Sequence, residues 1–133
     1  MNKKIIMVGA FTALLAVVIG AFGAHGLKAL LPAAQLNTFE IGVRYQFYHS
    51  FAILLAGILY FHFPDKKIIM AGWFFLGGIM LFSGSLYLLA CREILGIPSW
   101  TFLGPLTPIG GVLFIIGWAM IILGISTTKL SNR

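Results

Sequence analysis

Residues 68–90 read IIMAGWFFLGGIMLFSGSLYLLA, an apolar run that contains no Asp, Glu, Lys or Arg. A helix of roughly 20 such residues, rising ~1.5 Å per residue, crosses the ~30 Å hydrocarbon core of a bilayer. Three more stretches of similar length also lack charged side chains: 5–24, 45–63 and 102–125. Because lipid offers no hydrogen-bond partners, such segments satisfy their backbone groups as helices. The sequence therefore predicts an all-α integral membrane protein, a four-transmembrane-helix bundle.

The composition predicts a single membrane domain over residues 1–133. Of the 133 residues, 60% are hydrophobic and 9% are charged, and the mean hydropathy is +1.03. Four spans use most of this length, so little chain is left for a soluble domain. Cys91 is the one cysteine, which excludes an internal disulfide and a thiolate metal cluster.

The basic residues lie at the ends of the apolar stretches and predict the orientation of the chain. One side of a four-span chain carries Lys3, Lys4, Lys66, Lys67, Lys129 and Arg133. The other side carries Lys28, Arg44 and Arg92. Because the side richer in Lys and Arg is usually cytoplasmic, both termini are predicted to be cytoplasmic, with these lysines close to anionic lipid headgroups. Basic residues dispersed in this way do not form a nucleic-acid-binding face, so no nucleic acid is expected as a partner.

The connections around the second span predict a short helix and a hairpin. Pro32 suits the first position of a helix, and Leu36, Phe39 and Val43 recur on one face of it. This pattern is typical of a short interfacial helix between the first two spans. An alternative is that the helix runs continuously into the second span. Pro64 ends that span in a tight turn, so the second and third spans form an antiparallel hairpin.

The segment before the fourth span allows two structures. Residues 105–111 read PLTPIGG, and a regular helix throughout is not expected because proline lacks a backbone N–H donor. We favour a helix that begins at about Pro108, with Thr107 as its N-cap. The alternative is a short re-entrant dip that is buried in protein.

Small residues at helical spacing predict how the spans pack. In lipid, helices associate where small side chains let their backbones approach. Four ridges of small residues occur: Ala16, Gly20 and Ala24; Ala52 and Ala56; Gly77, Gly84 and Cys91; and Gly110, Gly117 and Gly124. The seven-residue period of the last two ridges predicts left-handed packing, with the third and fourth spans tightly opposed. Ridges that stay exposed favour a homo-oligomer.

Polar residues near the predicted outer surface form the candidate ligand-binding site, because polar groups at membrane depth are costly and often functional. The candidates are His25, Glu40, Arg44, Gln46, His49, Ser83, Ser85, Tyr87, Arg92 and Thr107. We expect six residues to cluster at that surface: His25, Glu40, Arg44, His49, Arg92 and Glu93. The alternative is that the polar residues only hold helices together, and that the two arginines only end the spans.

His49 is expected about one turn inside the outer end of the second span. Its spacing from Tyr45 and Ala52 turns it toward packed protein, where the ring needs a hydrogen-bond partner. The candidate partners are Gln46, Ser83, Ser85, Tyr87 and Thr107.

Motifs for catalysis or cofactors are lacking in this sequence. Two histidines without a well-placed carboxylate pair fall short of a metal site. The serines have no orienting Asp or nucleophile motif, and the glycine pairs lie inside apolar spans, away from any phosphate-binding Lys. We therefore expect no enzyme activity, no metal and no cofactor.

Several motifs in order resemble a known family. They are GAFGAHG at 20–26, Tyr45-Gln46 followed by His49, LFSGSLY at 81–87, TPIGG at 107–111 and then Gly117-Trp118. Together they resemble the YgdD-like small bacterial inner-membrane proteins over nearly the whole chain. The resemblance implies a multi-pass protein of the bacterial inner membrane. It implies no activity, substrate or catalytic residue, since none is established for the family.

Three functions fit these features. The favoured one is a homo-oligomeric helical bundle that binds a lipid or small amphiphile at its outer side, where Arg44 and Arg92 recognise an anionic group. The second is a permease or channel for a small solute or proton, with His49 and Ser85 in its polar path. The third is a structural accessory subunit of a complex with an unidentified membrane partner.

Overall fold

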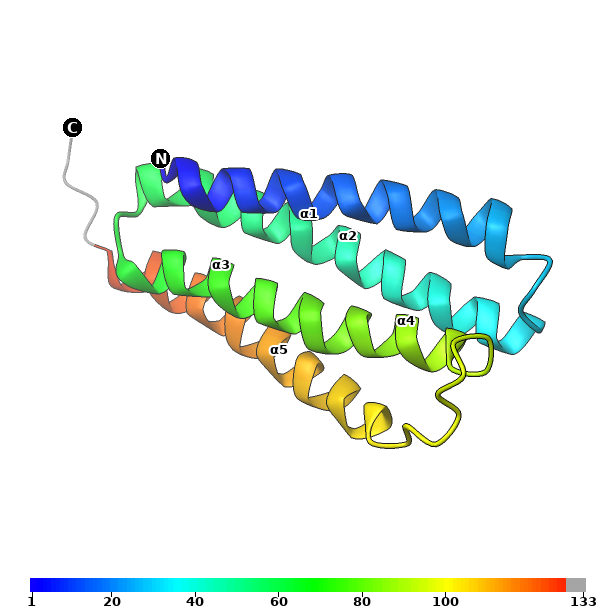
Figure 1. The fold of residues 1–133 in the computed structure, drawn as a ribbon. Helices are drawn as coiled ribbons and strands as arrows, with labels where there is room; N and C mark the ends of the chain where they lie inside the picture. The colour runs from blue at the N-terminus through cyan, green and yellow to red at the C-terminus, as the bar shows by residue number, and fades with distance from the viewer. Residues whose placement is uncertain (129–133) are drawn as a thin grey trace.

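The computed structural model describes residues 1–128, which form four long helical segments laid side by side (Figure 1). The first segment is α1 (Lys3–Phe22) with the π-helical turn η1 (Gly23–Leu27), and the second is α2 (Ala33–His62). The third consists of α3 (Lys66–Gly78), the π-helical turn η2 (Ile79–Ser83) and α4 (Gly84–Cys91). The fourth is α5 (Leu103–Thr127). Lys129 and Arg133, which entered the predicted charge balance, lie outside the described residues.

The apolar stretches found in the sequence lie in these helices, apart from the end residues Phe63 and Phe102, which flank α2 and α5. Three segments are long and apolar enough to cross a membrane: Lys3–Leu27, Lys66–Cys91 and Leu103–Thr127. The remaining segment, α2, is the longest helix, with 30 residues. Its middle carries Gln46 and His49, whose polarity lowers the mean hydropathy of this helix. The all-helical prediction is therefore confirmed for the described residues.

The interfacial helix predicted between the first two spans is not a separate element. The turns that follow Pro32 belong to α2, which runs without a break to His62. Phe39 in these turns is buried, and its ring lies 4.9 Å from the Tyr87 ring of α4. A Cβ on Gly23 would lie 2.6 Å from the same Phe39 ring. The short-helix prediction is thus wrong because this part of α2 packs on protein, and the continuous alternative is correct.

The prolines near the fourth segment do not interrupt it. α5 starts at Leu103 with Phe102 in the N-cap position, so Pro105 falls in its first turn. The first four N–H groups of a helix have no intrahelical acceptor, so Pro105 removes no helical bond. Only Pro108 does. Both structures predicted here, a start at Pro108 capped by Thr107 and a re-entrant dip, are therefore wrong.

Glycines set the close contact between α3 and α5. Gly117 faces Phe75, and Gly124 faces Ile68; an added Cβ would lie 2.5 Å and 2.6 Å from these side chains. The ridge predicted on the fourth span, and the tight opposition of the third and fourth spans, are confirmed. The ridge predicted on the third span is wrong at Gly84, since nothing lies within 4 Å of a Cβ there. The extra residue in the π-helical turn η2 breaks the seven-residue period.

Asp65 joins the start of α3 to the end of α5. Its Oδ1 accepts a 2.8 Å hydrogen bond from the Lys67 backbone N–H, which caps α3. Its Oδ2 accepts from Lys67 Nζ at 3.2 Å and from Thr127 Oγ1 at 3.0 Å. The bonds from the Lys67 backbone and side chain lower the pKa of the Asp65 carboxyl. We call this end of the bundle, which holds the starts of α1 and α3 and the ends of α2 and α5, the amino-terminal end (Figure 1).

Candidate functional site

A groove of about 840 Å³ lies between α1 and the third segment, with Gln46 of α2 at its base. We call it the lateral groove. Most of its lining is apolar, and the polar members are Lys4, Thr12, Gln46 and Tyr87. Ile79 and Met80 of η2 and the adjoining Gly84 form part of its wall. Gly84 has open space at its Cβ position, so the wall is recessed here.

Two of the sequence-predicted residues form a hydrogen-bonded chain at the groove. Tyr87 Oη donates to Gln46 Oε1 at 2.7 Å. Gln46 Nε2 donates to the Thr12 backbone oxygen at 2.9 Å. Gln46 is 3% exposed, so these bonds satisfy a polar group that would otherwise be costly to bury. The chain of bonds links α1, α2 and α4.

His49 lies deeper than predicted. It is 16 residues beyond Ala33, the start of α2, which corresponds to ~24 Å along the helix. The prediction of one turn inside the outer end is wrong because α2 starts well before the apolar stretch that marked the span. Figure 1 shows α2 running the whole length of the bundle.

Aromatic side chains surround the His49 ring. Its plane stacks on Phe114 with centroids 3.4 Å apart, and Trp118 Nε1 donates to its Nε2 at 3.4 Å. Its Nδ1 lies 2.8 Å from the Tyr45 backbone oxygen, which can only accept, so Nδ1–H is the donor of this bond. These hydrogen-bond partners differ from those predicted. Trp118 reaches the His49 ring because α5 lies close to this ring. No feature of the sequence around Trp118 predicted this contact.

The remaining polar candidates of the third segment lie near α5 and α2. The Ser85 hydroxyl lies 2.9 Å from the Phe82 backbone oxygen and 2.7 Å from Thr107 Oγ1. Because the Ser85 hydroxyl donates its hydrogen bond to the Phe82 backbone oxygen, the Thr107 hydroxyl is the donor of the bond between Thr107 and Ser85. Ser83 in η2 is fully buried, and its hydroxyl has no hydrogen-bond partner among residues 1–128.

The charged candidates lie at the opposite end of the bundle and occupy separate places. Glu40 and Arg44 line a hollow of about 260 Å³ at the junction of α1 and α2. Arg92 Nε lies 3.6 Å from Glu93 Oε1. His25 is exposed, with its Nδ1 2.9 Å from the Ala21 backbone oxygen. His49 lies away from this end, so the predicted six-residue cluster does not include it.

The groove contains residues that the sequence reasoning did not select. Thr12 is the one hydroxyl residue in the apolar stretch 5–24, which is a signal that the sequence did offer. Lys4 entered the sequence analysis only as one of the basic residues that predict the orientation of the chain. Gly84 was assigned to packing. Among residues 1–128, no three His, Cys, Asp or Glu side chains come close enough together to hold a metal ion.

Comparison with known proteins gives the family. A family model described as "Protein of unknown function (DUF423)" matches residues 19–111. The chain belongs to this family. A relative, the UPF0382 membrane protein YwdK of Bacillus subtilis strain 168, is 43% identical over 126 residues, which cover 91% of this chain and 94% of YwdK. The UPF0382 membrane protein SAB0533 of Staphylococcus aureus strain bovine RF122 is 44% identical over 130 residues, 98% of this chain and 99% of that protein.

The DUF423 family is thus one of small bacterial membrane proteins of unknown function. This confirms the membrane assignment and, at that level, the resemblance inferred from the motifs. The relatives carry the name UPF0382, not the YgdD-like name. No solved structure matches the chain. Residues 19–111 include Gln46 and Tyr87, so the polar base of the lateral groove lies in the part that defines the family.

Proposed function

We propose that this protein is a non-enzymatic lipid-binding protein that holds one acyl chain of a membrane lipid or similar amphiphile in the lateral groove. The observation that supports this proposal most directly is the lateral groove. Its volume of about 840 Å³ and its largely apolar lining fit ligand sites, which measure roughly 300–1,000 Å³ and carry few polar groups. The groove lies open on the flank of the bundle, so a chain enters it directly from the bilayer.

The proposal includes a four-span topology in the bacterial cell membrane with cytoplasmic termini. Residues 28–32 connect α1 and η1 to α2, and residues 63–65 connect α2 to α3. These connections are too short to carry the chain around the bundle. If the first and third segments cross the membrane, α2 between them crosses it too. Lys3, Lys4, Lys66 and Lys67 at the amino-terminal end favour a cytoplasmic position for that end.

Gly84→Leu tests the groove. Gly84 lines the groove and nothing lies within 4 Å of a Cβ at this position, so we expect a Leu side chain here to occupy part of the groove. Leu also has a higher helix propensity than Gly, so the variant is expected to fold. We expect native mass spectrometry of the mildly solubilised protein to detect a retained lipid on the wild type. In Gly84→Leu the lipid-bound fraction should fall at least roughly tenfold, about the effect of 1.4 kcal/mol.

Gly104→Leu is the matched control. Gly104 also has open space at its Cβ position but does not line the groove, so its variant should retain lipid. Equal retention by Gly84→Leu and the wild type would contradict the proposal. A wild type that retains no lipid would contradict it too, and a stoichiometric partner in a gentle pull-down would then favour the accessory role. The same spectra report whether the protein self-associates, as we expect for a homo-oligomer.

A further inference from the structure

We infer that the occupant of the lateral groove is an anionic phospholipid whose headgroup lies at the amino-terminal end of the bundle, beside Lys4. The inference rests on the proposed lipid-binding function. It adds the charge class of the lipid and the direction in which its chain lies. It also moves the headgroup away from Arg44 and Arg92, where the sequence had suggested an anion.

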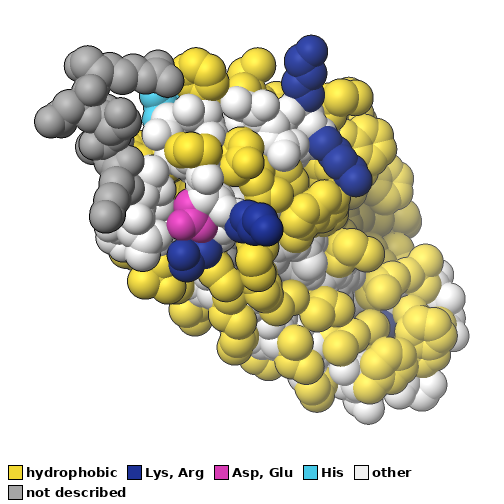
Figure 2. Space-filling view, turned by 90° about the vertical axis from the view of Figure 1, so that its left-hand side faces the viewer, with side chains coloured by type: hydrophobic (Ala, Val, Ile, Leu, Met, Phe, Trp, Pro, Cys, Tyr) yellow, Lys and Arg dark blue, Asp and Glu magenta, His cyan; other side chains and the backbone are white. Residues whose placement is uncertain are grey.

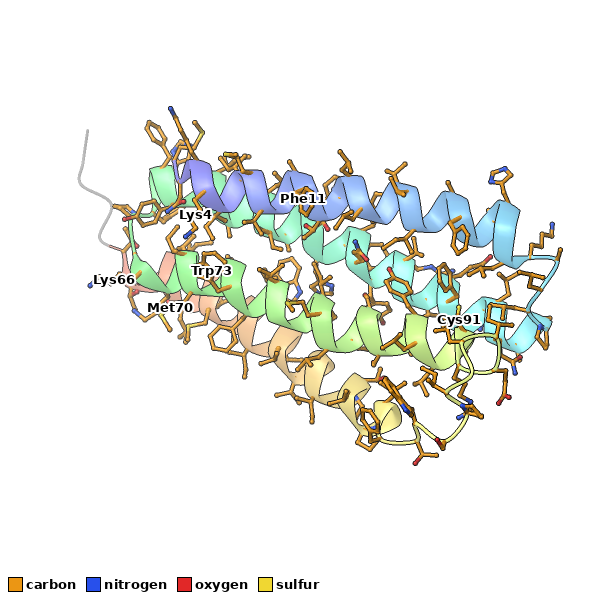
Figure 3. The ribbon with its side chains drawn as sticks, in the orientation of Figure 1. Lys4, Phe11, Lys66, Met70, Trp73 and Cys91 are labelled. Atoms are coloured by element: carbon orange, nitrogen blue, oxygen red, sulfur yellow. The ribbon has the colours of Figure 1, made fainter. Side chains whose placement is uncertain are left out.

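Lys4 is the charged residue that lines the groove. Its Nζ lies 5.3 Å from the centroid of the Trp73 ring, so the ammonium is held above a ring face by a cation–π contact. Figure 3 shows Lys4 of α1 and Trp73 of α3 approaching one another across the gap between the two helices. Contact with a ring face leaves ammonium N–H groups available to an acceptor. Within residues 1–128 the ion pairs are Lys67 with Asp65 and Arg92 with Glu93, so no carboxylate there neutralises Lys4.

The surroundings of Lys4 are positively charged. Lys3, Lys66 and Lys67 belong to the same end of the bundle, and the nearby Asp65 is already paired with Lys67. Figure 2 looks onto this end and shows Lys and Arg side chains beside an acidic side chain and farther along the surface, with hydrophobic surface beyond them. A phosphate placed here experiences attraction from several ammonium groups, as expected at a membrane surface.

The far end of the groove is uncharged. Ile19, Gly84 and Tyr87 line it there. Arg44 lines a different hollow, and Arg92 is paired with Glu93. Lys4 and Ile19 are 15 residues apart on one helical segment, which is ~22 Å. Since one leaflet occupies about half of the ~30 Å hydrocarbon core, the groove is long enough for a whole acyl chain that starts at Lys4.

The test compares two lipids that differ only in their headgroup. The protein is reconstituted in nanodiscs of equal parts phosphatidylglycerol and phosphatidylcholine with identical acyl chains, and native mass spectrometry counts the lipids retained after release. We expect the wild type to retain phosphatidylglycerol preferentially. Lys4→Gln should reduce that preference about fivefold, the effect of one charge at a membrane surface. Lys4→Arg keeps the charge and should keep the preference.

Lys66→Gln is the control, because it removes an exposed charge from the same end but outside the groove. It should leave the preference unchanged. Retention of both lipids in equal amounts by the wild type would overturn the inference while leaving the proposed function in place. An equal loss of preference in Lys66→Gln would also overturn it, since general surface charge would then explain the effect. A wild type that retains neither lipid would overturn both.

Discussion

At the scale of single residues, three buried polar side chains, Gln46, His49 and Ser85, each pair with a side chain of another helix. Gln46 meets Tyr87, Ser85 meets Thr107, and His49 meets Trp118. In a membrane, such a bond is modest in energy because the unfolded helices also find partners. The residue types were evident from the sequence, since polar groups are rare in apolar spans. The pairs were not, because they depend on how each helix is rotated about its axis.

Tyr87→Phe should destabilise the protein slightly. The substitution keeps the ring beside Phe39 but removes the donor to Gln46 Oε1. The free energy of unfolding in SDS titrations should fall by about 0.6 kcal/mol, the average found for hydrogen bonds between membrane helices. Tyr48→Phe is the control, since Tyr48 is exposed. Equal effects of the two substitutions would show that the Gln46 bond adds nothing to stability.

At the scale of helices, glycines decide which pairs of segments touch. Gly117 and Gly124 of α5 face α3, and Gly110 faces η2, within one chain, so this ridge is used inside the bundle and is not left for a second copy. A seven-residue period predicted the contact because both helices keep their register along α3 and α5. The same argument failed beyond η2, where one extra residue in the turn rotates the following helix by about 100°. A π-helical turn has no clear mark in the sequence.

Gly110→Ala should separate α5 from the third segment. The new Cβ would overlap the Phe82 backbone nitrogen, and a backbone atom cannot move aside as a flexible side chain can. Overpacking of this kind costs about 1–3 kcal/mol, which SDS unfolding should detect. Gly104→Ala on the same helix has open space and serves as the control. A stability of Gly110→Ala equal to that of the control would contradict the described contact.

At the scale of the whole molecule, the two ends of the bundle differ in charge, and this difference predicts the orientation in the membrane. The amino-terminal end has more basic residues than the end that carries Lys28, Arg44 and Arg92. This balance predicts a cytoplasmic amino-terminal end. If it is correct, the headgroup bound at Lys4 belongs to the cytoplasmic leaflet.

Cysteine labelling in intact cells should reveal that orientation. In a Cys91→Ser background, Asn37→Cys marks the start of α2, and His62→Cys marks its last residue, at the amino-terminal end of the bundle. Both native residues are exposed, and neither replacement alters the formal charge. A membrane-impermeant maleimide should label Asn37→Cys in intact cells and His62→Cys only after lysis. The reverse pattern would place the termini outside. Labelling of both sites in intact cells would show that α2 does not cross the membrane.

The sequence by itself determined that the chain is helical, roughly where each helix lies, and that Pro64 ends one hairpin arm. An apolar run of about 20 residues leaves the backbone in lipid little choice but a helix, so composition alone carries that information. Only the tertiary structure decided that α2 begins at Ala33, that Tyr87 bonds to Gln46, and that Lys4 lies in a groove. These features depend on the rotation and spacing of whole helices. Packing between distant segments sets both, and apart from the glycine period of α5 no local pattern of residues encoded it.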